Sequence, residues 1–440
     1  MDRSEVSENP RPRVAGARAS LWLPLLPALA VFLVSLATAL RVALRLTGGR
    51  LIYALDDAYI HMAVARTLAL DGIWGCTPFH FSSSSSSLLW TSLLGLAYRA
   101  FGVHDSLPLL VNVVFAVATL AVANVALARL GLSPLLRGTA LLAVVVAFPL
   151  AGMVLIGMEH VLHLLLTITF AAVAVAALTS PAEAPAAGRR RTFALCLLGA
   201  LLGTSRYEGL FLIALVCLAL AIRRQLGRAV AVGLASLLPV AAFGAFSVAN
   251  GSYFLPNPLM VKAVAETEST LSAVLKPFGS EDLEFLKNNR AMPILLALGA
   301  LAALAQWRLR RGLWRPEVLL PLLLAAMIAV HGHFVFSPLY WAYRYDAYLV
   351  GFGLLVAAAA LADVPTPGAL PRGAVPAVLV AVLVPVVADV SEGLYPAAEV
   401  AGIRGTYLEQ FEPGDYELRV VVTDRNASAI VSRAVAFTVE

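Results

Sequence analysis

Long apolar segments recur along the chain, and they limit its possible folds more than any other feature. Hydrophobic residues make up 60% of the 440 residues and charged residues 13%, so no soluble domain of this size could cover the apolar surface. A membrane-spanning helix needs about 20 apolar residues, and we predict an all-α polytopic membrane protein with about eleven such helices. The segments are 21–46, 107–128, 138–156, 160–178, 192–205, 207–222, 229–249, 291–306, 318–334, 345–362 and 375–391.

Basic residues are unevenly distributed between the loops, and their distribution predicts the orientation of the chain. Residues 1–20 carry four arginines, and thirteen more lie in loops that eleven crossings place on the same side, together 17 of the 32 lysines and arginines. Cytoplasmic loops are enriched in these residues, so we expect a cytoplasmic N-terminus and a long extracytoplasmic loop at 47–106. The thirteen are Arg129, Arg137, Arg189, Arg190, Arg191, Arg223, Arg224, Arg228, Arg308, Arg310, Arg311, Arg315 and Arg372.

The chain divides into three parts. Residues 1–20 form a cytoplasmic tail, 21–391 the transmembrane domain, and 392–440 an extracytoplasmic tail. Within the tail, 416–423 and 429–439 alternate between apolar and polar residues and are rich in β-branched side chains, which predicts a short β-hairpin. An isolated hairpin is only marginally stable in water, so we expect it to dock on another element or to be a fragment of a larger domain.

Charge and cysteine usage exclude several partners. The net charge of +5 comes from arginines in short loops and forms no basic patch, so we expect no nucleic-acid partner. The spacing of Cys76, Cys196 and Cys217 indicates neither a disulfide framework nor a zinc site. The first apolar segment is too long for a cleaved signal peptide and is expected to be a signal anchor.

Two adjacent carboxylates, Asp56 and Asp57, lie just beyond the first apolar segment. An acidic pair beside a membrane helix is costly unless it faces water, a cation or a substrate. One interpretation is a general base at the outer membrane surface. The alternative is a helix N-cap, because Asp before an amphipathic run is a good helix start. Both can hold, since one carboxylate can cap the helix while the other acts as a base.

Further charged and polar groups collect at the predicted outer ends of the spans. If the outward turns that carry these groups converge on one face of the protein, the groups build a single site together with Asp56 and Asp57. Structural roles are the alternative: a helix cap for Glu159 and a mutual ion pair for Arg206 and Glu208. Lys262 and Arg344 would then be interfacial anchors. The groups are Glu159, His160, Arg206, Tyr207, Glu208, Lys262, His331, His333, Arg344, Tyr345 and Asp346.

Two other polar features suggest no catalytic role. His331 and His333 are two residues apart, so on a helix they point to different faces and make a poor metal pair. The serine run 82–87 has low complexity, and we expect a flexible outer loop there.

These residue types suit sugar transfer from a lipid-linked donor. A carboxylate can remove the proton of an acceptor hydroxyl while the sugar is transferred. Cations among Arg344, Lys262 and Arg206 can bind the donor phosphate and stabilise it as it leaves. The chain contains no Walker-type or Rossmann fingerprint that would bind a nucleotide.

The sequence contains several short motifs. They are Asp56-Asp57-Ala58-Tyr59-Ile60, Ala65-Arg66, Gly72, Leu89-Trp90, Gly157-Met158-Glu159, Ser205-Arg206-Tyr207-Glu208-Gly209, Leu255-Pro256-Asn257 with Lys262, and Arg344-Tyr345. These motifs resemble those of bacterial GT-C glycosyltransferases, among them protein mannosyltransferases, aminoarabinose transferases and mycobacterial-type arabinofuranosyltransferases. The similarity covers about residues 20–390 and departs from the family in two places. The family usually has Arg-Pro-Glu-Gly where this chain has Arg-Tyr-Glu-Gly at 206–209, and a hairpin tail stands where the family has a large soluble C-terminal domain.

The resemblance implies an enzyme of the bacterial cytoplasmic membrane that takes sugars from polyprenyl-phosphate donors at the extracytoplasmic face, usually with inversion. Its catalytic base falls on Asp56, with Asp57 as the second choice. Lys262 and Arg344 would bind the donor phosphate. The residues expected to line the substrate site are Glu159, Arg206, Glu208, Tyr345 and His61.

We therefore predict a glycosyltransferase that acts on a hydroxyl of a glycan, lipid or protein and is surrounded by membrane lipids. We expect no cofactor and no divalent metal. A multi-span transporter or lipid flippase is the main alternative, and it predicts charges near the bilayer midplane and internal inverted repeats. A third possibility is an inactive scaffold whose tail serves as an interaction element.

Overall fold

The computed structural model describes residues 21–180, 185–258, 291–308, 312–334, 345–362, 414–424 and 429–439. The predicted N-terminal tail, the span 375–391, and the site residues Lys262 and Arg344 lie outside the described residues. The described chain is mostly helical, as predicted. Its helices are α2 (Leu25–Leu46), α3 (Asp56–Asp71), α4 (Leu88–Phe101), α5 (Leu107–Arg129), α6 (Pro134–Ala147), α7 (Leu150–Leu155), α8 (His160–Thr179), α9 (Pro185–Ser205), α10 (Gly209–Ile222), α11 (Leu226–Ala249), α15 (Ala291–Arg308), α16 (Pro316–Phe334) and α17 (Ala347–Ala362).

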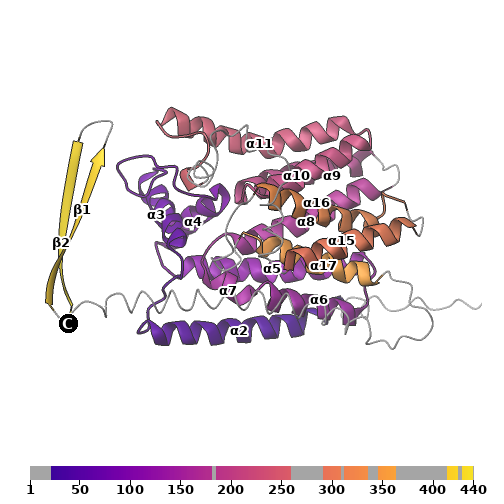
Figure 1. Cartoon of the computed structure of the whole chain (residues 1–440), viewed down its shortest axis with the longest axis horizontal. Coiled ribbons are helices and arrows are strands. Elements are labelled where there is room, and N and C mark those ends of the chain that lie inside the picture. Colours follow the sequence, from indigo (N-terminus) through magenta and orange to yellow (C-terminus); the bar gives the residue numbers. More distant parts are fainter. Residues whose placement is uncertain are drawn as a thin grey trace, which may run out of the picture.

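The long helices run side by side and alternate in direction, so the turns between them gather at two ends of one bundle (Figure 1). Helix α8 lies at its centre and packs against α5, α9 and α17. Helix α2 lies at the edge and buries one stripe of residues at helical spacing, Leu25, Ala28, Phe32 and Leu36. The short helices α3 and α4 pack on each other at one end of the bundle (Figure 1).

Four described helices, α2, α5, α8 and α11, are long and apolar enough to cross a membrane. Five shorter helices are also apolar, and they lie in the same bundle. This composition is that of a membrane protein, while the number of crossings and the orientation of the chain stay predictions.

Two boundaries differ from the predicted spans. The segment 138–156 was expected to form one helix, but it forms α6 and α7, which are separated at Phe148 and Pro149. Proline has no N–H to donate and disfavours helical geometry in the residue before it. Helix α9 begins at Pro185, seven residues before the predicted start at 192, because proline is favoured in the first turn and arginines are good helix formers.

Arg137 is also placed differently from the prediction, which put it in a loop. It lies within α6, and only 4% of its surface is exposed. One guanidinium nitrogen donates to the Leu21 carbonyl oxygen (3.2 Å) and to Oδ1 of Asn124 (3.1 Å). The arginine therefore ties α6 to α5 and to the start of α2, which explains why a charged residue is buried there.

Near the C-terminus, strands β1 (Gly414–Asp424) and β2 (Ala429–Val439) pair antiparallel. Gly414 lies opposite Val439, and Asp424 lies opposite Ala429. The expected docking of this pair on another element stays a prediction.

Candidate functional site

The predicted catalytic pair lies in the first turn of α3. Asp56 is exposed and Asp57 is half-buried. Leu55 is the N-cap residue, and no side chain caps the helix, so the predicted N-cap role does not apply. The Asp56 carboxylate instead accepts a hydrogen bond from the N–H of Asp57 (3.0 Å). Both carboxylates lie at the N-terminal end of α3, where the helix dipole is positive.

His61 lies one turn beyond Asp57 on the same face of α3. Its side chain is buried, and Nδ1 lies 2.8 Å from the Thr91 hydroxyl and 3.2 Å from the Ser85 hydroxyl. On the other side of the ring, Nε2 lies 3.5 Å from Oε2 of Glu159. The imidazole therefore bridges the first loop and the turn before α8.

The turn that carries Glu159 is held from two sides. Gly157 has φ +73°, and a Cβ atom there would lie 2.5 Å from the Tyr53 ring, so only glycine fits. Asn112 of α5 donates its side-chain N–H to the Met158 carbonyl oxygen (2.9 Å). Tyr53 is itself fixed, because its hydroxyl donates to the Asp105 carbonyl oxygen (2.6 Å) and accepts from the Leu109 N–H (3.2 Å). The position of Glu159 is thus set by three separate segments.

Arg206 lies in the turn between α9 and α10 and forms two buried ion pairs. Its NH1 atom lies 2.7 Å from Oε1 of Glu159, and its NH2 atom lies 2.7 Å from Oε1 of Glu208. The side chains of the three residues are at most 12% exposed. We call His61, Glu159, Arg206 and Glu208 the buried charge cluster. The predicted pairing of Arg206 with Glu208 is correct, and Glu159, the N-cap residue of α8, makes no capping hydrogen bond.

Mutual attraction between Arg206 and its carboxylate partners keeps Arg206 and Glu208 charged. Burial alone raises the pKa of Glu208, but the positive charge of Arg206 and its hydrogen bond outweigh that effect and lower the pKa to about 2. For Arg206, burial lowers the pKa, but the charges of Glu208 and Glu159 outweigh it, so the pKa is raised above its ordinary value. The pair therefore stays ionised at every physiological pH.

A second set of polar side chains lies beside the buried charge cluster. The Arg206 guanidinium stacks over the Tyr345 ring, with 5.2 Å to the ring centroid. Next to Tyr345, the Asp346 carboxylate lies 2.6 Å from Nε2 of His331, whose Nδ1 lies 3.1 Å from the Tyr348 hydroxyl. Among the described residues, no group of three or more His, Cys, Asp or Glu side chains could hold a metal ion.

The serine run 82–87 corrects a prediction, because it is not a loose loop. Ser83, Ser85 and Ser87 are buried, whereas the serines between them are more exposed. This alternation is that of an extended chain with one face inward. The Ser85 hydroxyl bonds to His61 and to Thr91 (2.8 Å), and the Ser87 hydroxyl caps α4 by accepting from the Trp90 N–H (3.2 Å).

The structure brings several of the predicted site residues together. Arg206 contacts both Glu159 and Tyr345, as described above, and His61 joins Glu159 to the first loop. The segment before Lys262 contacts the first loop, because the N–H of Asn257 donates to the Ser83 carbonyl oxygen (2.8 Å). The carboxylates of Asp56 and Asp57 lie one turn from His61, nearer the surface.

Other polar residues of the site did not stand out in the sequence. Thr91 directly follows the Leu89-Trp90 motif and Ser205 begins the motif at 205–209, but neither was predicted to line the site. The Ser205 hydroxyl lies 2.9 Å from Nδ1 of His163. His163 follows Glu159 by four residues, and this helical spacing is a sequence signal that places the two side chains on the same face of α8. The alternate spacing of Ser83, Ser85 and Ser87 is the signal for the buried side of the serine run.

Comparison with known proteins identifies no relative. No protein-family model matches the chain, and no curated protein or solved structure is significantly similar to it. Function is therefore argued from the chemistry of the site.

Proposed function

We propose that this protein is a membrane glycosyltransferase of the GT-C type, which transfers a sugar from a polyprenyl-phosphate donor to a hydroxyl acceptor. The observation that carries the proposal is the position of Asp56 and Asp57. They lie at the accessible start of α3, one turn from a histidine that belongs to the buried charge cluster. This arrangement joins a solvent-reachable carboxylate to a rigid support, which a general base requires.

In this proposal, Asp56 takes the proton of the acceptor hydroxyl as the oxygen attacks the anomeric carbon of the donor sugar. The bond from that carbon to the phosphate oxygen breaks, and the polyprenyl phosphate leaves with the bonding electrons. Attack on the face opposite the leaving group inverts the configuration. Asp57, half-buried beside His61, orients the first turn of α3 or serves as the base in its place.

The charge of the described site supports an assignment of the donor phosphate to cations outside the buried charge cluster. Two glutamates face one arginine in the buried charge cluster, and Asp56 and Asp57 add two further carboxylates. Arg206 is engaged by both glutamates, so we assign it to positioning and not to phosphate binding. A negative phosphate needs additional cations. We assign this role to Lys262 and Arg344. Tyr345, which follows Arg344, contacts Arg206, and Asn257, five residues before Lys262, donates its N–H to the Ser83 carbonyl oxygen.

The location of the charges favours transfer over transport. A transport pathway is expected to carry charged residues near the middle of its helices. The members of the buried charge cluster lie near helix ends, in the first turns of α3, at the start of α8 and in the turn between α9 and α10.

The test is transfer of label from radiolabelled polyprenyl-phosphate sugars in membranes that contain the wild type or Asp56→Asn. General-base catalysis contributes about 10²- to 10⁴-fold, so the variant should lose transfer by that factor. Asp57→Asn, measured alongside, identifies the base if Asp56→Asn remains active. Asp71→Asn is the matched control, because Asp71 is an exposed carboxylate at the other end of α3.

Label that reaches an acceptor in the wild type and in Asp71→Asn, but not in Asp56→Asn, supports the proposal. Absence of transfer from every donor tested, with folded wild-type protein in the membrane, overturns it in favour of transport or a scaffold role. Full activity in both Asp56→Asn and Asp57→Asn refutes the assignment of the base.

A further inference from the structure

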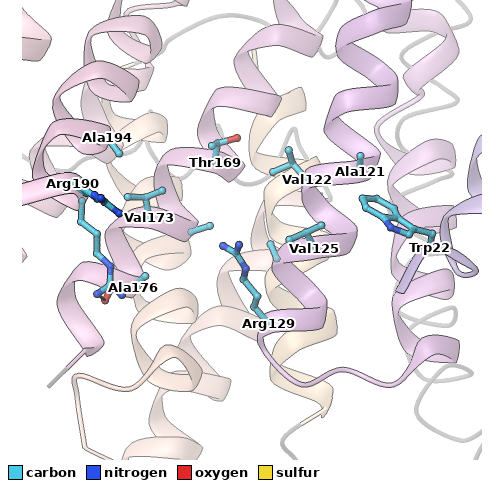
Figure 2. Close-up of a pocket in the computed structure, with 13 residues that line it drawn as sticks. Trp22, Ala121, Val122, Val125, Arg129, Thr169, Val173, Ala176, Arg190 and Ala194 are labelled. Atoms are coloured by element: carbon cyan, nitrogen blue, oxygen red, sulfur yellow. Dashed lines mark hydrogen bonds between the residues drawn. The ribbon is translucent and has the colours of Figure 1, made fainter. Parts of the chain in front are cut away.

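A surface groove of about 610 Å³ lies across α5, α8 and α9 near the arginine-rich end of the bundle (Figure 2). Its walls are mainly alanine and valine side chains, such as Val122, Val125 and Val173, and exposed Trp22 lies at one side. Small side chains on neighbouring helices leave the space open. Between Val122 and Arg129, the α5 wall extends about 10 Å along the helix axis.

Three arginines line the groove at this end of the bundle, and their bonding differs. Arg191 donates to the Ala176 carbonyl oxygen (3.0 Å) and to the Ser180 hydroxyl (2.6 Å), so it satisfies the last turn of α8. Arg129 and Arg190 are exposed, and among the described residues their guanidinium groups have no hydrogen-bond or ion-pair partner. Figure 2 shows Arg129 on α5 and Arg190 on α9, with α8 between them.

We propose that this groove binds an anionic phospholipid of the surrounding bilayer, with the phosphate held by Arg129 and Arg190 and an acyl chain along the alanine and valine wall. Charge complementarity carries the argument. Two exposed guanidinium groups at the end of an apolar groove match a ligand with a negative head and an apolar tail. Trp22 is a residue type enriched where lipid headgroups lie.

The groove is distinct from the candidate catalytic site. Helix α5 begins beside Tyr53 at the acidic end and finishes at Arg129, and its 23 residues span about 35 Å. A lipid in the groove therefore does not reach Asp56 and is a bound lipid of the fold, not the sugar donor. The proposal stands independently of the transferase activity.

The experiment is native mass spectrometry of the purified full-length protein with phosphatidylglycerol or phosphatidylcholine carrying the same acyl chains. We expect the wild type to retain phosphatidylglycerol about tenfold better, since each basic residue near an anionic lipid adds attraction. The double variant Arg129→Gln/Arg190→Gln should lose this preference. The matched control is Arg45→Gln/Arg99→Gln, which removes two exposed arginines in the last turns of α2 and α4.

A second variant tests the apolar wall of the groove. It also keeps the proposal testable if the double variant Arg129→Gln/Arg190→Gln fails to fold. Ala172→Phe fills the groove while both arginines remain, and it should lower retention of phosphatidylglycerol. Ala241→Phe, at an exposed position of α11, should not. Equal retention of both lipids by the wild type overturns the proposal, as does unchanged preference in Ala172→Phe and in the folded double variant. Retention of a polyprenyl phosphate with no retention of phosphatidylglycerol also overturns it.

Discussion

The two ends of the helical bundle use charge in different ways. At the end that carries α3 and α4, the charged groups of the buried cluster contact one another at short distances and are shielded from solvent. At the other end, Arg129, Arg189 and Arg190 lie at helix ends and are exposed. Buried charges are costly unless paired, whereas exposed charges near helix ends cost little.

This difference between the two ends shows which charges the stability of the fold depends on. Loss of Arg206 leaves Glu159 and Glu208 in the interior without their cation, which lowers the stability of the fold. Loss of an exposed arginine leaves nothing unsatisfied. Exposed arginines are thus available for orientation of the chain or for binding a lipid, while Arg206 is committed to the fold of the site.

The largest expected effect separates Arg206 from Arg129. Arg206→Gln leaves Glu159 and Glu208 buried without their cation, and it should destabilise the protein by about 3–5 kcal/mol. Arg129→Gln should change stability by no more than about 0.5 kcal/mol, as is usual for surface substitutions. Chemical unfolding of both variants in the same detergent measures the difference. Equal stability of the two variants would contradict the proposed contrast between the ends.

A smaller effect is expected at two glycines with positive φ, one at each end. Gly157→Ala places a Cβ atom 2.5 Å from the Tyr53 ring, whereas Gly131→Ala places one in open space. Both variants bear the cost of a left-handed conformation, about 1–2 kcal/mol, and Gly157→Ala adds overpacking of about 1–3 kcal/mol. The apparent melting temperature should therefore fall further for Gly157→Ala. An equal fall would mean that Tyr53 moves aside at no cost.

The smallest effect concerns pH. The pKa of Glu208 is about 2 in the folded protein, below its ordinary value of 4.5. A lowered folded pKa adds stability that is complete above the unfolded pKa and is lost as the pH falls through the folded pKa. The stability difference between the wild type and Glu208→Gln should therefore be constant from pH 5 to 8 and shrink between about pH 4.5 and 2. A slope in this difference between pH 6 and 8, measured by unfolding, would contradict the assignment.

The sequence alone determined which segments form the long helices and at which end of the bundle the turns with Glu159 and Arg206 lie. Runs of apolar residues predicted the bounds of α2, α5 and α8 within a few residues, because helix formation in such segments is a local property. Alternation of these helices then placed the turns with Glu159 and Arg206 at the same end. Local chemistry was enough for this, except where Pro149 divided one expected span.

Only the tertiary structure decided which of these residues meet. Glu159 and Arg206 are separated by 47 residues, and His61 reaches them from another helix. Their contacts depend on the packing of α3, α8 and the α9–α10 turn, which hydrophobic periodicity does not encode. The burial of Ser85 was hidden for the same reason, since a hydroxyl is buried only where a partner such as His61 is brought to it.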